Sequence, residues 1–268
     1  MLGRCFAGIL CCIVATASVA EDAVMLSLET ADASRGWEGV GRLDIVGKGF
    51  CTGALVDVDQ VLTAAHCLYR DDGQLVEISQ IQFLAGLRGG QARAYRGVKR
   101  AVTHPDYVHR SGSNVGREVS HDLALLELDQ PIRNSRIRPF ETDARPGRGD
   151  EVGVVSYGKD RADNPTLQET CEVLGVRLGV LVMTCSVDFG SSGSPVFSVK
   201  NGVARIVSVV SSMAELDERK VSLGTSLARP LAELKAEFAT VAPARVGGDQ
   251  RFIEAGDRAD TGAKFLRP

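Results

Sequence analysis

The sequence predicts an all-β protein with two barrel-sized halves, followed by a short C-terminal helix. Short apolar segments recur along most of the chain and are separated by turns rich in Gly, Pro and Asp, a pattern typical of β-barrels. Helical periodicity is almost absent before the segment that begins at Pro230. With 268 residues, the chain is long enough for each half to bury a core of its own.

The first half, residues 21–138, begins with a mixed segment over residues 21–36 that we interpret as an irregular lead-in. Short apolar runs bounded by turn residues then predict six strands, at Val40–Val46, Gly53–Val58, Gln60–Ala64, Ile78–Leu84, Ala94–Thr103 and Leu123–Leu128. The stretch Arg110–Ser120 is polar and contains glycine, so we interpret it as a surface loop.

The second half, residues 139–241, starts with a Pro- and Gly-rich link at Pro139–Asp150. Its expected strands are Glu151–Tyr157, Leu167–Val176, Val180–Cys185, Ser194–Val199, Ala204–Ser211 and Val221–Ser226. A helix is expected from Pro230, because Leu231, Leu234 and Phe238 recur on one helical face. Residues 242–268 contain few apolar anchors and are expected to form a flexible tail.

The first twenty residues are typical of a secretory signal peptide. Arg4 supplies a positive charge, Phe6–Val14 is apolar, and Ser18-Val19-Ala20 offers small residues for cleavage before Glu21. An uncleaved membrane anchor is the alternative, but the apolar core is short for spanning a bilayer. We therefore expect a secreted or periplasmic protein that is not membrane-bound after cleavage.

Composition and cysteine usage narrow the class further. The chain is 44% hydrophobic and 24% charged, with a net charge of −3, so it has no basic excess that would suggest a nucleic-acid partner. Four cysteines remain beyond the signal peptide, at Cys51, Cys67, Cys171 and Cys185, and an even number in a secreted chain indicates disulfides. Free thiols or a metal site are the alternatives. No C-x-x-C spacing is present, so we expect no bound metal, and we expect no cofactor.

Three stretches carry the residue types of nucleophilic catalysis. Phe189–Pro195 is a tight loop between apolar runs, in which glycines on both sides of Ser192 permit a sharp turn. Taken alone, that loop is more typical of a Gly/Ser surface turn. Val61–Cys67 is an apolar strand that ends at a histidine, and His121–Leu128 is an apolar run headed by an aspartate. A nucleophile, a base and an orienting acid at separate strand ends form the constellation of a serine hydrolase.

Read in chain order, T-A-A-H-C, H-D-L-A-L-L and G-S-S-G-S-P resemble the three motifs of the chymotrypsin/trypsin-like serine proteases. The resemblance covers roughly residues 35–240. It implies two six-stranded antiparallel β-barrels, a terminal helix, polypeptide substrates and peptide-bond hydrolysis. We expect the protein to act as a monomer.

The resemblance assigns Ser192 as nucleophile, His66 as general base and Asp122 as the acid that orients the imidazole. The backbone N–H groups of Gly190 and Ser192 would form the oxyanion hole. The competing nucleophiles are Ser191 and Ser194, and the motif G-x-S-G-x-P singles out Ser192. The competing histidines are His104, His109 and His121, which lie in a turn, in a polar loop and on the opposite strand face from Asp122.

The cysteines are expected to pair by proximity in the chain. Cys51 and Cys67 are 16 residues apart, and the family pairs the cysteine after its catalytic histidine with one at this spacing. Cys171 and Cys185 are 14 residues apart and flank a segment that reads as strand, Gly turn and strand.

The chain departs from the trypsin pattern next to the nucleophile. Ser191 occupies the position of the acid that, in trypsin, binds a new N-terminus after zymogen cleavage. Ile45-Val46-Gly47 superficially resembles an activation sequence but lies too near Cys51 to be a released terminus. In this respect the chain is similar to bacterial glutamyl-endopeptidase-like members. We therefore expect activity without a newly exposed N-terminus.

Substrate preference follows only from approximate alignment of the pocket. Ser186 falls at the pocket base, Ser211 on the substrate-backbone strand, and Ser212 and Met213 on the wall, which Met213 would narrow. Ser186 is not an acid, although Asp188 is nearby, so we expect a small-to-medium apolar P1 residue. The alternative function is a catalytically silent binding module with its pocket closed by Met213. The complete His/Asp/Ser set argues against that alternative.

Overall fold

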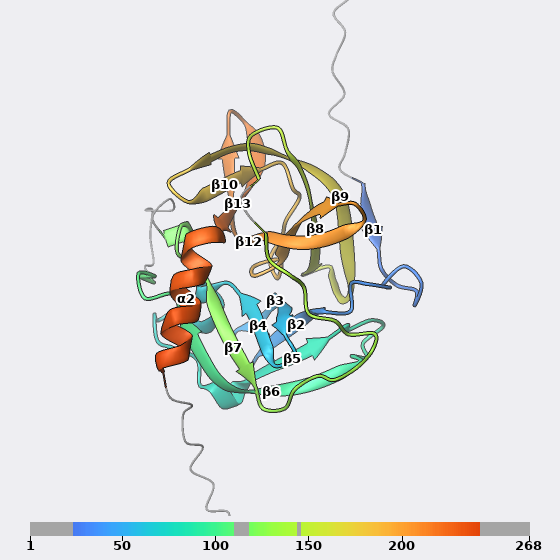
Figure 1. The fold of residues 1–268 in the computed structure, drawn as a ribbon, viewed down its shortest axis with the longest axis vertical. Coiled ribbons are helices and arrows are strands. Elements are labelled where there is room, and N and C mark those ends of the chain that lie inside the picture. The colour runs from blue at the N-terminus through green and yellow to red at the C-terminus, as the bar shows by residue number, and fades with distance from the viewer. Residues whose placement is uncertain (1–23, 110–117, 144–145, 242–268) are drawn as a thin grey trace, which may run out of the picture.

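The computed structural model describes residues 24–109, 118–143 and 146–241. The predicted signal peptide, most of the loop predicted at Arg110–Ser120 and the predicted C-terminal tail lie outside the described residues. The described chain is mostly β-structure arranged as two rings of strands with one C-terminal helix (Figure 1). The predicted fold class is confirmed. No helix among the described residues combines the length and hydropathy that a membrane crossing requires.

The first ring is a closed antiparallel barrel. Its strand order is β2 (Val40–Ile45), β3 (Gly49–Asp57), β4 (Gln60–Thr63), β7 (Ala124–Leu128), β6 (Ala94–Thr103) and β5 (Ile81–Ala85). Alternate side chains point inward, so Leu43, Leu62, Phe83 and Leu125 are almost completely buried. Closure pairs both edges of every strand and leaves no free edge in this ring.

The second ring closes because β8 (Glu151–Gly158) pairs with both of its neighbours. The order runs from β8 through β9 (Arg161–Arg177), β10 (Val180–Met183), β13 (Arg219–Ser226) and β12 (Val203–Leu216) to β11 (Pro195–Lys200), which pairs with β8 again. The six strands are antiparallel throughout.

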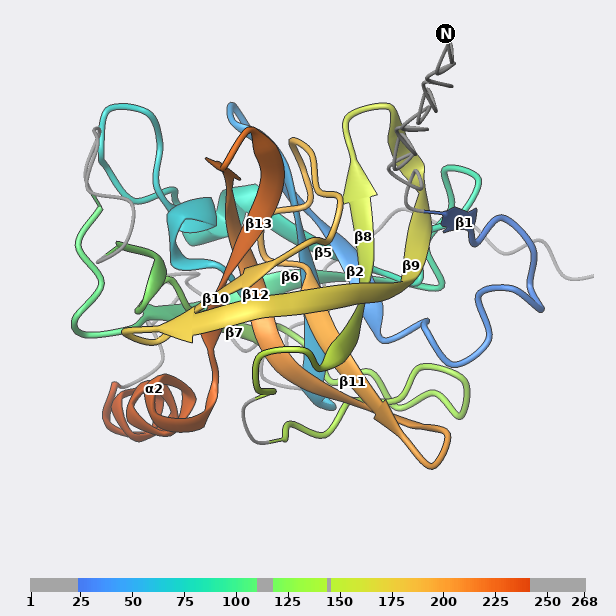
Figure 2. The ribbon, with the colours of Figure 1, turned by 90° about the horizontal axis from the view of Figure 1, so that it is seen from above.

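A short strand precedes both rings, where the sequence predicted an irregular lead-in. β1 (Met25–Ser27) pairs antiparallel with β9, with Met25 opposite Gln168 and Ser27 opposite Thr166. Figures 1 and 2 show β1 beside β9. The prediction was wrong here because backbone hydrogen bonds to β9 hold β1, which has no apolar alternation of its own.

Two hairpins extend beyond the predicted strand limits. β9 begins at Arg161 rather than at Leu167, and β12 continues to Leu216 rather than ending at Ser211. Asp217 and Glu218, which connect β12 to β13, both have positive φ, as a tight two-residue hairpin turn requires. The added residues of β9 are mostly polar, and those of β12 are only partly buried or exposed, so neither extension is marked by a run of buried apolar side chains. The strand expected from Ile78 instead starts at Ile81, after the 3₁₀-helix η2 (Ile78–Gln80).

Helix α2 (Ala228–Thr240) follows the second ring but packs against β6 and β7 of the first. It starts two residues before the predicted Pro230, and the predicted face formed by Leu231, Leu234 and Phe238 is buried. The Arg100 guanidinium lies 3.9 Å from the centre of the Phe238 ring and donates to the Phe238 carbonyl. Helix α2 thereby ties the two rings together.

The rings also share a core at their junction. The Phe197 ring of β11 lies 5.0 Å from Trp37 and 4.8 Å from Phe140, centre to centre. The fully buried Tyr157 of β8 donates its hydroxyl to the Leu87 carbonyl and its N–H to the Thr52 hydroxyl, both in the first half. These contacts fix one ring against the other and so fix any site between them.

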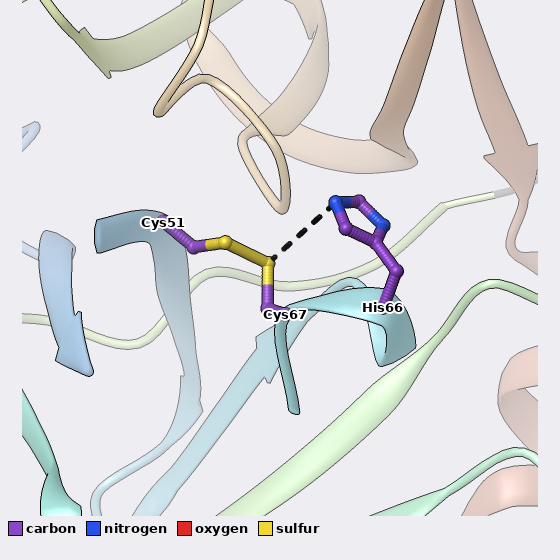
Figure 3. Close-up of side chains that lie close together, drawn as sticks. All are labelled: Cys51, His66 and Cys67. Carbon is purple, nitrogen blue, oxygen red and sulfur yellow. Dashed lines mark hydrogen bonds between the residues drawn. A yellow bond between two sulfur atoms is a disulfide. The ribbon is translucent and has the colours of Figure 1, made fainter. Parts of the chain in front are cut away.

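Both predicted disulfides are present. Cys51–Cys67 joins β3 to the 3₁₀-helix η1 (Ala65–Leu68), which carries His66, as Figure 3 shows. Cys171–Cys185 joins β9 to the segment that follows β10.

Replacing Cys51 and Cys67 together by alanine should lower the free energy of unfolding by about 3 kcal/mol, because a cross-link across 16 residues restricts the unfolded chain. Denaturant unfolding of the oxidised wild type and the double variant measures the difference. The matched variant at Cys171 and Cys185, which opens a loop of 14 residues, should lose a similar amount. Undiminished stability in either variant would contradict this account.

Candidate active site

His66 and Asp122 form a close pair at the junction of the two rings. His66 lies in η1, directly after β4, and Asp122 lies two residues before β7, which is paired with β4. The His66 N–H donates to Asp122 Oδ1 at 2.9 Å, and His66 Nδ1 lies 2.7 Å from Asp122 Oδ2. An ionised carboxylate only accepts hydrogen bonds, so the proton of a neutral imidazole is on Nδ1 and Nε2 carries a lone pair.

Asp122 is held as a carboxylate although it is buried. Its side chain is 3% exposed, whereas that of His66 is 27% exposed, so the acid is enclosed and the imidazole is reachable. The Ser211 hydroxyl of β12 donates a third hydrogen bond to Oδ2 at 2.5 Å. Burial alone would raise the pKa of Asp122, but the neighbouring His66 and the hydrogen bonds from His66 and Ser211 hold that pKa below its ordinary value.

The loop before β11, which contains Gly190 and Gly193, packs closely against the first ring. Gly190 and Gly193 have φ of +93° and +80°, a region that side chains disfavour. A Cβ on Gly193 would lie 2.1 Å from Thr63 Oγ1, and one on Gly190 would lie 2.3 Å from the Phe50 ring. Only glycine fits at either position, and the resulting contact places the loop close to the end of β4, where His66 follows.

Thr52 of β3 forms two hydrogen bonds with the loop that carries Ser192. Its N–H donates to the Ser192 carbonyl at 2.8 Å, and its hydroxyl donates to the Gly190 carbonyl at 2.9 Å. Both carbonyls therefore point toward β3. Within the described part of the chain, the N–H groups of Gly190 and Ser192 have no hydrogen-bond acceptor. Two free donors beside a serine hydroxyl are the arrangement that stabilises a developing oxyanion.

Ser192 is partly buried, and its hydroxyl forms no hydrogen bond with His66. His66 Nε2 instead lies 4.0 Å from Cys67 Sγ, the contact drawn in Figure 3. With the proton on Nδ1, neither Nε2 nor the disulfide sulfur carries a hydrogen, so this contact is not a hydrogen bond and Nε2 remains available to accept one from another donor. Catalytic hydrogen bonds are often long in unliganded enzymes and shorten when the substrate binds.

Among the described residues, two groups of side chains have the composition of a metal site, but several of their ligand atoms already have protein partners. Cys51 and Cys67, beside His66, are joined in a disulfide and offer no thiolate. In the group His104, Asp106 and His121, His104 Nδ1 accepts the Asp106 N–H at 3.1 Å and its Nε2 lies 3.2 Å from Glu233 Oε2.

The predicted specificity residues occupy different environments. Ser186 is exposed, and its N–H donates to Gln168 Oε1. The Ser211 hydroxyl is used by Asp122, whereas the Ser212 hydroxyl is buried without a partner among the described residues. The side chain of Met213 is 47% exposed, so it does not fill an interior space.

Lys48 is a supporting residue that the sequence analysis missed. It lies in the turn between β2 and β3, and its Nζ donates to the carbonyls of His66 at 2.5 Å, Cys67 at 3.3 Å and Tyr69. These carbonyls end η1, where a cation is favourable. Lys48 thus holds the turn that carries His66. Nothing in its local sequence, V-G-K-G, indicates this role.

Lys48→Met should lower the free energy of unfolding by about 1 kcal/mol, because the carbonyls at the end of η1 lose a charged donor in a partly solvated position. Lys48→Arg, which keeps the charge, should recover part of the loss. Thermal unfolding of both variants, with Lys235→Met on the exposed face of α2 as control, provides the test. Equal loss in the Lys48→Met variant and the control would rule out a specific role.

Known proteins are similar to this chain in sequence. A family model described as Trypsin matches residues 29–226. Human kallikrein-10 is 34% identical over 115 residues, which cover 42% of this chain and 40% of that protein. Human mannan-binding lectin serine protease 1 is 29% identical over 128 residues, which cover 42% of this chain and 17% of that protein. The chain thus spans less than half the length of these relatives.

Solved structures show the same fold. A Glu endopeptidase in complex with MPD has a TM-score of 0.66 and 16% identity, over 82% of this chain and 98% of that one. A scabies mite inactivated protease paralogue has a TM-score of 0.62 and 17% identity, over 77% of this chain and 95% of that one. With the family model matching most of its length, the chain belongs to the trypsin family of serine proteases.

Proposed function

We propose that this protein is a secreted serine endopeptidase that cleaves peptide bonds through a Ser192–His66–Asp122 triad and an acyl-enzyme intermediate. Membership in the trypsin family supports a protease function. The observation that carries the finer proposal is the doubly hydrogen-bonded His66–Asp122 pair, whose Nε2 is reachable beside a loop with two free N–H groups.

In the proposed reaction, Ser192 Oγ attacks the carbonyl carbon of the substrate while His66 Nε2 takes the hydroxyl proton. Asp122 keeps the Nδ1 proton in place and stabilises the imidazolium that forms. The negative charge on the tetrahedral oxygen is accepted by the N–H groups of Gly190 and Ser192. His66 then gives its proton to the leaving amine, and a water activated by the same imidazole hydrolyses the acyl-enzyme.

One movement is needed before this reaction can start. Because Ser192 Oγ and His66 Nε2 are not hydrogen-bonded in the structure, these two atoms must come within hydrogen-bond distance when substrate enters. The loop backbone is already anchored, since Thr52 donates to the carbonyls on both sides of Ser191.

The substrate class and the setting of the enzyme follow from the same residues. Ser186, Ser212 and Met213 offer no carboxylate to bind a basic P1 side chain, which supports a small-to-medium apolar P1 residue. Two disulfides support an oxidising compartment, outside the cell or in a periplasm. We propose that the enzyme works there as a monomer on polypeptides.

A catalytically silent binding module is the second candidate, because one structural neighbour is described as an inactivated paralogue. Covalent labelling with a fluorophosphonate distinguishes the two candidates, since only an activated serine reacts. Wild type should be labelled and Ser192→Ala should not. Absence of labelling in the folded wild type would favour the binding module.

Ser192→Ala and His66→Ala should each remove nearly all hydrolysis of a chromogenic peptide while leaving the circular dichroism spectrum unchanged. Asp122→Asn should reduce turnover about 10⁴-fold, because the amide stabilises the wrong imidazole tautomer. Ser194→Ala is the matched control, since it removes the hydroxyl two positions away and should retain activity. Labelling that persists in Ser192→Ala and disappears in Ser194→Ala would overturn the assignment.

A further inference from the structure

Ser191, directly before the proposed nucleophile, is completely buried and uses its hydroxyl fully. The hydroxyl donates to the Tyr157 carbonyl at 3.1 Å and accepts the Asp188 N–H at 3.2 Å. It also accepts a hydrogen bond from Arg161 Nη2 at 3.2 Å. This serine is thus the point at which β8, β9 and the oxyanion loop, residues 188–193, are joined.

The Arg161 guanidinium is held beside Ser191 by contacts with β8. It is the first residue of β9, and its Nη1 donates to the Ser156 carbonyl at 2.5 Å and to the Ser156 hydroxyl at 3.0 Å. A Cβ on Gly158 would lie 2.9 Å from Arg161 Cζ, so the glycine leaves room for the guanidinium. The side chain is thereby held between β8 and the loop.

The Arg161 guanidinium is a permanent cation without a direct ionic partner among the described residues. No carboxylate among the described residues forms an ion pair with Arg161. Burial lowers the pKa of the Arg161 guanidinium and the charge of Asp188 raises it, but an arginine remains protonated at neutral pH. Its charge therefore acts on the neutral oxygens of Ser156 and Ser191.

Ser191 occupies the position of the acid to which trypsin binds its new N-terminus, as the sequence resemblance implies. In this chain an ammonium entering there would find Ser191 in place of a carboxylate and Arg161 as a like charge. Burying an unpaired ammonium next to a cation is strongly unfavourable. The start of the described chain is also engaged elsewhere, since β1 pairs with β9 and the Leu28 N–H donates to the Pro165 carbonyl.

We propose that Arg161 is the positioning residue for the oxyanion hole and that it replaces the N-terminal ammonium of trypsin. This inference rests on the proposed function. Gly190 and Ser192, the two proposed N–H donors, flank Ser191, whose own N–H donates to the Asp188 carbonyl at 2.9 Å. The guanidinium holds Ser191, and Ser191 sets the direction of both N–H groups. The loop is ordered from within the chain, so activity does not require a newly exposed N-terminus.

The test compares Arg161→Met and Arg161→Lys with Arg177→Met, which removes an exposed arginine at the other end of β9. Loss of a single oxyanion-hole donor reduces kcat by about 10²–10³-fold, and we expect about 10²-fold for Arg161→Met with KM nearly unchanged. Arg161→Lys should be intermediate, because an ammonium keeps the charge but lacks the fork that reaches both serines. Millimolar methylguanidinium should partly rescue Arg161→Met, and Arg177→Met should match wild type.

A second measurement does not depend on catalysis. Hydrogen exchange of the peptide that covers residues 186–195 should be faster in Arg161→Met than in wild type, and unchanged in Arg177→Met. If wild type neither hydrolyses peptides nor reacts with a fluorophosphonate, the proposed function fails, while the exchange result still decides whether Arg161 orders the loop. If wild type is active and Arg161→Met keeps its kcat and its exchange rate, the role of Arg161 alone is overturned. Should Arg161→Met not fold, Arg161→Lys carries the same comparison.

The claim that activity does not require a newly exposed N-terminus is tested with two forms of the chain. One form starts at Glu21, and the other has a few residues added before Glu21. Equal turnover of a chromogenic peptide supports activity that is independent of the terminus. An extended form that is inactive until it is trimmed would overturn it.

Discussion

A buried carboxylate shared by the two rings is the interaction on which this site depends. Asp122 comes from the first ring and accepts two hydrogen bonds from His66, while Ser211 of the second ring donates the third. A buried charge is unfavourable unless its lone pairs are satisfied, so the rings must dock in the one arrangement that brings all these donors together. The shared core around Phe197 and the packing of α2 on the first ring secure that arrangement. The orientation of the imidazole is therefore a property of the whole fold.

The loop that carries Ser192 is likewise held in place by residues that take no part in the proposed chemistry. Thr52 anchors the carbonyls on either side of Ser191, and Gly190 and Gly193 allow the close approach. Two cations from outside the motifs complete the support, Lys48 on the turn that carries His66 and Arg161 on Ser191. Each donates to carbonyl or hydroxyl oxygens and not to a catalytic group. Such residues hold the geometry without altering the acid–base chemistry.

The sequence revealed the motifs but not their supports, for a physical reason. A nucleophile loop, a strand that ends in histidine and an apolar run headed by aspartate are local patterns, and the two ring-shaped halves follow from short apolar runs. Lys48 is a single charged residue in a turn and Arg161 is one at the start of a strand, and they act on oxygens 18 and 30 residues away. β1 was missed because its pairing uses only the backbone. The extensions of β9 and β12 were missed because neither is marked by a run of buried apolar side chains.

The most direct test of the central claim is a crystal structure of the protein after reaction with a peptidyl phosphonate. The account predicts a covalent bond between phosphorus and Ser192 Oγ, with the phosphoryl oxygen hydrogen-bonded to the N–H groups of Gly190 and Ser192. His66 Nε2 should then lie within hydrogen-bond distance of Ser192 Oγ, and Asp122 should retain its donors His66 and Ser211. An adduct on another serine, or a phosphoryl oxygen that points away from both N–H groups, would contradict it.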